Sequence, residues 1–195
     1  VKAAAAREAE LAGRTLSDPE QARLAGVYFG WAERLGKGEP APDAVRPAIP
    51  PDHARAIDAY RRGMAVLAPA ADRTTYRLAC ARHALALNDG RQAVQWATEA
   101  LEAWKPPAPN ATGTRPAAAP AWAAEAYLRK AEGSLLVGDV PGARGALRTL
   151  LALPSADETG FAPAAWILLG RTFVGDGAVG ALAQAKDAFA TYLRR

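Results

Sequence analysis

Apolar residues recur at helical spacing along this chain, in segments separated by breaks rich in Pro and Gly. The first segment follows Ser17-Asp18-Pro19-Glu20, which has the spacing of a helix-capping box, and its apolar side chains are three or four residues apart: Leu24, Val27, Tyr28, Trp31 and Leu35. Asp52, Asp89 and Asp139 precede further segments of this kind and are expected to cap their helices. The pattern predicts an all-α chain of about nine helices.

Two Pro-rich segments, residues 36–51 and 105–120, have no apolar periodicity and are predicted to be loops, because Pro removes a backbone donor from a helix. The helices on either side of these loops are expected to form antiparallel hairpins within one domain spanning residues 1–195. Residues 1–15 are expected to form a lone helix, and the hairpins are expected at about 18–69, 72–105, 119–154 and 161–195.

A repeated pattern underlies these hairpins. Trp166-x-x-Leu169-Gly170-x-x-Phe173 places two rings and a Leu-Gly pair on one helical stripe, where Gly170 leaves room for a neighbouring helix. A second pattern, Ala followed four residues later by a core residue, occurs four times, beginning at Ala56, Ala93, Ala143 and Ala185. Together these patterns resemble the tetratricopeptide repeat, in a degenerate bacterial-type array whose units exceed the usual length of about 34 residues.

This resemblance implies a fold and a function. The fold would be a right-handed α-solenoid of stacked hairpins; armadillo- or HEAT-like repeats are the structural alternative, because their repeat length is nearer the observed spacing. The function would be that of a non-catalytic scaffold for protein–protein interaction, which binds a peptide or partner protein in a concave groove lined by the first helix of each hairpin. The alternative is a ligand-sensing or regulatory domain attached to an effector module.

If the hairpins stack in this way, four charged residues on the first helices are candidates for partner binding: Arg82, Arg129, Glu132 and Arg171. The three arginines would suit an acidic peptide or a C-terminal carboxylate, which a guanidinium can hold through two hydrogen bonds. A solvated outer face is the alternative interpretation of each position.

Charge and hydropathy bear on the other classes of partner. The chain has 24 Lys and Arg against 20 Asp and Glu, and the basic residues form no run, so we do not expect nucleic-acid binding. No stretch reaches the roughly 20 apolar residues of a membrane span, so direct membrane insertion is not expected.

The preference for Arg and Ala suggests a bacterial source, with the compartment (cell envelope, periplasm or cytoplasm) and the oligomeric state left open. Because the chain starts at Val1, a removed N-terminal segment or a longer parent protein is expected.

Candidate chemistry is sparse. Cys80 lies three residues before His83, but a structural zinc site needs about four ligands and His53 is placed at the far end of a Pro-rich loop, so no metal site is predicted. Cys80 is expected to pack in the core. The glycines at 175, 177 and 180 have the spacing of a dinucleotide fingerprint, yet they follow a predicted helix instead of a strand. With no nucleophile–base pattern either, neither an enzyme nor a cofactor is predicted.

Overall fold

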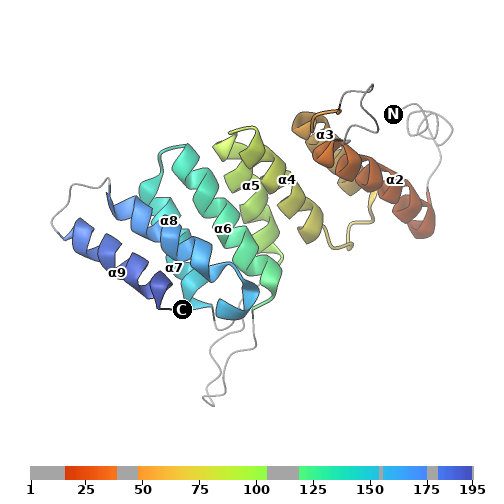
Figure 1. The fold of residues 1–195 in the computed structure, drawn as a ribbon. Helices are drawn as coiled ribbons and strands as arrows, with labels where there is room; N and C mark the ends of the chain where they lie inside the picture. The colour runs from red at the N-terminus through yellow and green to blue at the C-terminus, as the bar shows by residue number, and fades with distance from the viewer. Residues whose placement is uncertain (1–15, 39–47, 105–118, 154–155, 175–179, 195) are drawn as a thin grey trace, which may run out of the picture.

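The computed structural model describes residues 16–38, 48–104, 119–153, 156–174 and 180–194. Within these ranges the protein is all-helical, without a β-strand (Figure 1). The elements are α2 (Asp18–Lys37), α3 (His53–Val66), α4 (Thr74–Ala86), α5 (Gly90–Glu102), α6 (Ala121–Leu136), α7 (Val140–Ala152), the short 3-10 helix η1 (Asp157–Thr159), α8 (Ala162–Val174) and α9 (Ala181–Leu193). The expected lone helix at 1–15, most of the predicted loop at 105–120 and the glycines at 175 and 177 lie outside the described residues.

The helices begin where the sequence places capping side chains. The carboxylates of Asp52, Asp89 and Asp139 each accept a hydrogen bond from the backbone N–H three residues later, at 2.9 to 3.0 Å, which satisfies an amide that has no partner within the helix. The predicted caps are therefore confirmed. At the start of α2, the Glu20 carboxylate accepts from the backbone N–H of Ser17 at 3.0 Å. The Ser17 hydroxyl donates to the same carboxylate at 2.8 Å.

The first predicted loop begins later than the sequence suggested. Gly36 was expected to open it, but α2 continues through Lys37 and ends at Gly38. Gly38 has a φ of +66°, a backbone conformation that glycine adopts without steric cost, and its N–H still bonds to the Arg34 carbonyl at 3.1 Å. The positive φ at Gly38, and not the composition around Gly36, therefore sets the end of this helix.

Each helix packs mainly on its neighbours in the chain, from α2 on α3 through to α8 on α9, and α4 also packs on α6. Figure 1 shows the helices arranged in a row, with α2 and α3 at one end and α9 at the other. The four alanines of the repeated pattern lie on α3, α5, α7 and α9, and all are buried: Ala56, Ala93, Ala143 and Ala185. Their small side chains allow the helices to approach closely.

Glycines also mark close contacts between helices. The ring of Phe189 on α9 lies against Gly170 on α8, and the ring of Phe29 on α2 lies against Gly63 on α3 in the same manner. Of the pattern around Trp166, Leu169, Gly170 and Phe173 are buried and Trp166 is partly buried. The room predicted at Gly170 is thus filled by a side chain of the paired helix.

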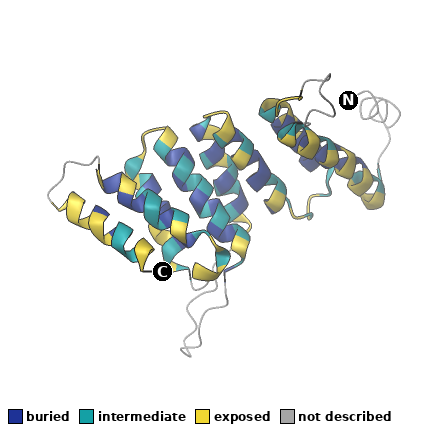
Figure 2. Ribbon diagram, viewed as in Figure 1, coloured by how far each residue is buried: buried dark blue, intermediate teal, exposed yellow. Residues whose placement is uncertain are grey.

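The buried side chains form two main clusters. One involves α6 to α9, and the other joins α2 and α3 to α4 and α5. Cys80 belongs to the second cluster and is fully buried, as expected for a core residue. Figure 2 shows exposed residues concentrated on the outer faces of α2 and α9, the helices at the two ends of the row. The described helices include none long and apolar enough to cross a membrane.

One side chain fixes the connection between α3 and α4. The guanidinium of Arg73 donates to the carbonyl oxygens of Met64, Leu67, Ala68, Pro69 and Ala71, at 2.8 to 3.1 Å. These carbonyls belong to the last turn of α3 and to the turn that follows it, where no helical partner is present. All five N–H groups that a guanidinium offers are used here. Arg73 therefore determines how the α2–α3 hairpin joins the rest of the chain.

Candidate functional site

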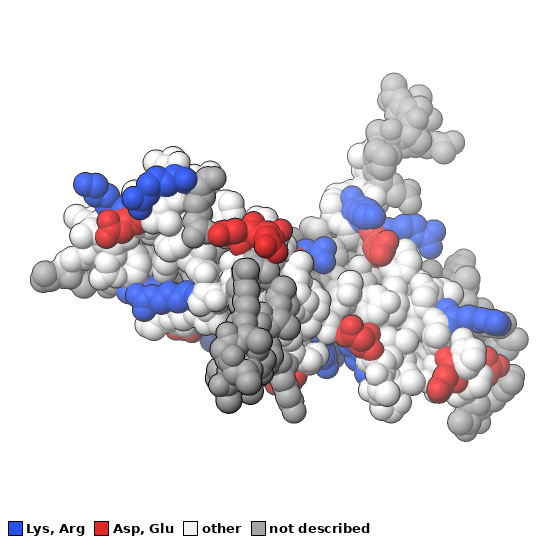
Figure 3. Space-filling model, turned by 90° about the horizontal axis from the view of Figure 1, so that it is seen from below, with Lys and Arg blue, Asp and Glu red and all other residues white. Residues whose placement is uncertain are grey.

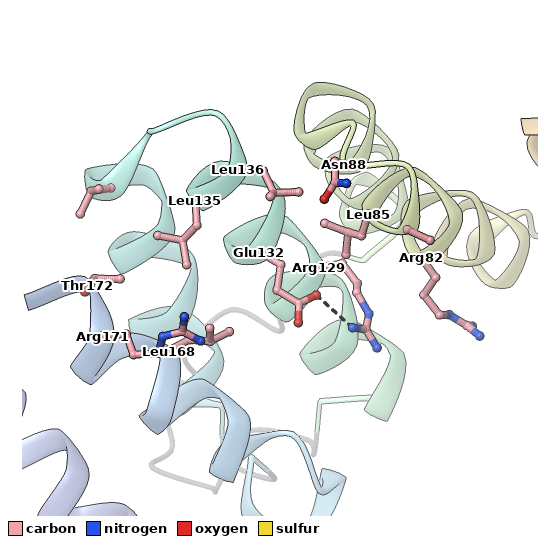
Figure 4. Close-up of a pocket in the computed structure, with 12 residues that line it drawn as sticks. Arg82, Leu85, Asn88, Arg129, Glu132, Leu135, Leu136, Leu168, Arg171 and Thr172 are labelled. Atoms are coloured by element: carbon pink, nitrogen blue, oxygen red, sulfur yellow. Dashed lines mark hydrogen bonds and ion pairs between the residues drawn. The ribbon is translucent and has the colours of Figure 1, made fainter. Parts of the chain in front are cut away.

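A cavity of about 860 Å³ lies where α4, α6 and α8 face one another. It is lined by side chains from these three helices, together with Asn88 after α4 and Val140 at the start of α7. α4, α6 and α8 alternate along the chain with α5 and α7, so residues far apart in sequence line the same cavity. We call it the α4–α6–α8 cavity (Figure 4).

All four residues predicted for partner binding line this cavity. Arg82 comes from α4, Arg129 and Glu132 from adjacent turns of α6, and Arg171 from α8. In Figure 4 the Arg129 and Glu132 side chains lie between Arg171 on one side and Arg82 on the other. The structure thus brings together charges that are up to about 90 residues apart in sequence, on one surface.

Three of these four side chains, Arg82, Arg129 and Glu132, belong to an ion-pair network whose fourth member is Glu125 on α6. Glu125 Oε1 lies 3.0 Å from Nε of Arg82 and 3.4 Å from Nε of Arg129. Nη1 of Arg129 also donates to Glu132 at 2.9 Å. The side chains of Glu125 and Arg129 are only 16% and 23% exposed, so water screens this network less than it would a surface pair. Arg82 and Arg129 are therefore largely neutralised within the protein.

Arg171 differs from the other two arginines. It is exposed, and within the described residues it makes no ion pair or hydrogen bond to an acidic side chain. Three arginines thus meet two glutamates around the cavity, which leaves one net positive charge. This charge is located at the α8 side, on Arg171.

Aliphatic side chains form the rest of the lining. Leu85 on α4, Leu135 and Leu136 on α6, and Leu168 on α8 all face the cavity, and Leu136 is 48% exposed. Such side chains, left in contact with water, favour the binding of an apolar group. The cavity therefore combines an apolar surface with one cation that has no acidic partner in the described structure.

The α8 wall is anchored to α7. Nε of Arg144 donates to the Thr172 hydroxyl at 3.1 Å, and the guanidinium carbon lies 4.2 Å from the centre of the Phe173 ring. The Thr172 hydroxyl in turn donates to the Leu169 carbonyl at 2.7 Å. Because Thr172 lines the cavity one residue after Arg171, these contacts hold the backbone that carries Arg171 in place.

Basic and acidic side chains are otherwise mixed on the surface. Figure 3 shows Lys and Arg interspersed with Asp and Glu on the face seen there, without a continuous basic area. Among the described residues, no group of three or more His, Cys, Asp and Glu side chains is placed to hold a metal ion. The α4–α6–α8 cavity is therefore the strongest candidate site in the described structure.

The histidines correct one inference from the sequence. His53 was placed far from His83, at the end of a Pro-rich loop, but it is the first residue of α3 and its Nδ1 lies 3.0 Å from Nδ1 of His83 on α4. Cys80, three residues before His83 on the same helix, lies in the core as expected. The start of α3 was expected from the Asp52 cap, and it is the packing of α3 on α4 that brings the two rings together.

The chain matches no protein-family model, no curated protein and no solved structure at a significant level. The functional interpretation therefore rests on the cavity and on the residues that line it.

Proposed function

We propose that this chain is a non-catalytic scaffold that binds a segment of another protein in the α4–α6–α8 cavity. The main support for this proposal is that one cavity with an apolar lining is also lined by four charged residues: Arg82, Arg129, Glu132 and Arg171. We further propose that the hairpins form a tetratricopeptide-like, right-handed solenoid. The consecutive packing of the helices and the buried alanines of the repeated pattern support this arrangement.

The charges of the cavity indicate what the bound segment would carry. Arg82 and Arg129 already share Glu125, so a ligand would have to compete with an internal carboxylate for them. Arg171 has no such competitor in the described residues. An acidic side chain or a C-terminal carboxylate near Arg171, with an aliphatic side chain against Leu135 or Leu168, would satisfy both features of the surface.

A small-molecule ligand is the second candidate. The volume of about 860 Å³ falls within the range of roughly 300 to 1,000 Å³ that is typical of small-molecule sites. In that case the chain would act as a sensor that regulates an attached module. A peptide-binding experiment separates the two candidates.

The experiment is selection from a display library of random peptides, in which one set has free C-termini, followed by affinity measurements on the selected peptides. Three proteins are compared: the unchanged chain, Arg171→Glu, and Arg148→Glu as a matched control. Arg148 is an exposed arginine on α7 that does not line the cavity. Circular dichroism checks that all three are folded.

We expect the selected peptides to carry an acidic group next to an aliphatic residue. Reversal of charge at Arg171 should weaken their binding at least tenfold, since a charge-assisted hydrogen bond contributes about 1.5 to 3 kcal/mol. Arg148→Glu should leave binding unchanged. Peptides that bind the Arg171→Glu protein as tightly as the unchanged chain would contradict the proposal, and a library that yields no binder at all would favour the small-molecule alternative.

A further inference from the structure

The only two histidines of the chain are in contact, although 30 residues separate them. His53 is the first residue of α3, and His83 lies near the C-terminal end of α4. Their Nδ1 atoms are 3.0 Å apart and their ring centres are 5.1 Å apart. This contact therefore joins the α2–α3 hairpin to α4, the helix on which that hairpin rests.

Both helices of the hairpin surround His83. A Cβ atom at Gly36, on α2, would lie 2.7 Å from Nε2 of His83, so the ring packs directly on the α2 backbone. On its other side, the ring of Tyr60 on α3 lies 5.9 Å from that of His83, centre to centre. Beside it, the rings of Phe29 on α2 and Tyr76 on α4 stack 3.5 Å apart. His83 thus lies at the junction between the hairpin and α4, in contact with both helices of the hairpin.

The contact between two Nδ1 atoms depends on protonation. A neutral imidazole carries one N–H, so one ring can donate its Nδ1–H to the unprotonated Nδ1 of the other. An imidazolium can also donate to a neutral partner. When both rings are protonated, each Nδ1 carries a hydrogen, and two positive charges meet where a hydrogen bond was. The pair is therefore compatible with no more than one positive charge.

The charged side chains around the two histidines also disfavour a second proton on the pair. His83 lines a small cavity together with Glu33 and Lys37 on α2 and Arg82 on α4. His53 lines a neighbouring cavity together with Arg34 on α2 and with Asp52 and Arg55 at the start of α3. Arg82 is paired with Glu125 and Arg55 with Asp52, which leaves Arg34 and Lys37 facing Glu33. Asp52 is already engaged, because it caps α3 and lies 3.4 Å from Nε of Arg55. The nearby carboxylates therefore offset little of the positive charge that a second proton on the histidine pair would add.

Burial lowers the pKa of His83, and the nearby His53 and Arg82 lower it further. A hairpin that has moved off α4 would expose His83 to water and return its pKa toward the ordinary value of about 6.5. The undocked form then binds more protons than the docked form, so the docked form loses stability as the pH falls below that value. At pH values above about 6.5, the contact stabilises the docked form to its full extent.

We propose that the His53–His83 pair is a pH-sensitive contact that holds the α2–α3 hairpin on α4 near neutral pH and releases it when both rings are protonated. The ligand is the proton itself, and the range of action lies between about pH 5 and 7, where histidine changes its charge. This regulation concerns the α3–α4 junction and does not depend on the function proposed for the α4–α6–α8 cavity.

Proton NMR of the unchanged chain tests the first step without any substitution, since two histidines give two ring signals. We expect the His83 signal to titrate below the ordinary histidine midpoint, because burial and the nearby His53 and Arg82 lower its pKa. In the His53→Gln protein, the midpoint of His83 should move upward, because the neighbouring charge is gone. Two signals with one common midpoint near 6.5, or a His83 midpoint that does not move in His53→Gln, would overturn the proposal.

Hydrogen exchange tests the second step. The measured quantity is the exchange rate of backbone amides in α2 and α3 relative to those in α6 and α7, corrected for the intrinsic effect of pH. We expect this ratio to rise by up to about tenfold when the pH falls from about 7 to about 5.5, because one proton more is bound on opening. A ratio that stays constant overturns the release of the hairpin. The double variant His53→Gln with His83→Gln is the control, and its ratio should be independent of pH in this range; an equal rise in the control would also overturn the proposal.

Discussion

The ring of Phe189 occupies the space that a side chain at Gly170 would need. A Cβ atom built at Gly170 would lie 2.6 Å from Cε1 and 2.7 Å from Cζ of this ring, whereas carbon atoms in contact are normally about 3.5 to 4.0 Å apart. A side chain at this position of α8 would therefore force the Phe189 ring of α9 to shift. The Leu-Gly pair of the repeated pattern thus has a direct steric role.

Substitution of Gly170 should consequently destabilise the protein. We expect Gly170→Leu to lower the free energy of unfolding by roughly 1 to 3 kcal/mol, the usual cost of overpacking, measured by denaturant or thermal unfolding. Gly145 on α7 is the matched control, since no atom outside its own helix lies within 4 Å of a Cβ built there. Gly145→Leu should be neutral or slightly stabilising, because Leu is the better helix former. Equal effects at the two positions would show that Phe189 does not pack on Gly170.

Replacement of Arg73 should weaken the connection between α3 and α4. We expect Arg73→Met to lower the free energy of unfolding by roughly 1.5 to 3 kcal/mol, since five carbonyl oxygens would lose a charged donor and water would compensate only in part. Arg62→Met is the control, because among the described residues the ion pair of Arg62 is an exposed one, with Asp58 at 2.9 Å. Its effect should stay within about 0.5 kcal/mol. The same loss from both substitutions would argue against a capping role for Arg73.

The arginines of the α4–α6–α8 cavity should differ in their effect on stability. Arg129→Ala leaves Glu132 without its 2.9 Å partner and takes one of two cations from Glu125, and we expect a loss of about 1 to 2 kcal/mol in the free energy of unfolding. Arg171→Ala should change it by no more than about 0.5 kcal/mol. Thermal unfolding of the two variants provides the comparison. If Arg171→Ala were the more destabilising, Arg171 would have a structural partner and the proposed binding role would lose its basis.

Cys80 should be unreactive while the protein is folded. Burial raises the pKa of its thiol to about 12, so almost no thiolate is present at about pH 8, and the side chain is also out of reach of a reagent. We expect iodoacetamide to leave the mass of the folded protein unchanged and to add one group per chain in denaturant. Similar rates of modification in the two conditions would place Cys80 outside the core.

The sequence predicted best those features that depend on residues three or four positions apart in the chain. Asp52, Asp89 and Asp139 could be recognised as caps because capping depends on a side chain and an amide three residues apart. Arg129 and Glu132 could be placed on one helix face from their spacing alone. Glu125 was within reach of the same reasoning, since it precedes Arg129 by four residues, but only the structure shows that it also binds Arg82 across the helices.

Other features had no signal in the sequence. Nothing in the pattern around Arg73 distinguishes a capping guanidinium from a solvated one, because its acceptors are backbone carbonyls that every residue has. The contact between His53 and His83 depends on how α3 lies against α4, which is a property of packing. Helical periodicity identifies the buried face of each helix, whereas the pairing of individual side chains across helices depends on the angle at which the helices meet.

The packing of each helix on its chain neighbours also bears on how the protein acquires its structure during synthesis. The main partners of a helix lie next to it in the chain, or one helix further on for α4 and α6. As the chain emerges from the ribosome, the partner that a second helix needs has therefore already been made, and little chain entropy is lost when the two meet. The α2–α3 hairpin can close before α6 is translated. Nascent chains of increasing length should accordingly gain protection from protease one hairpin at a time.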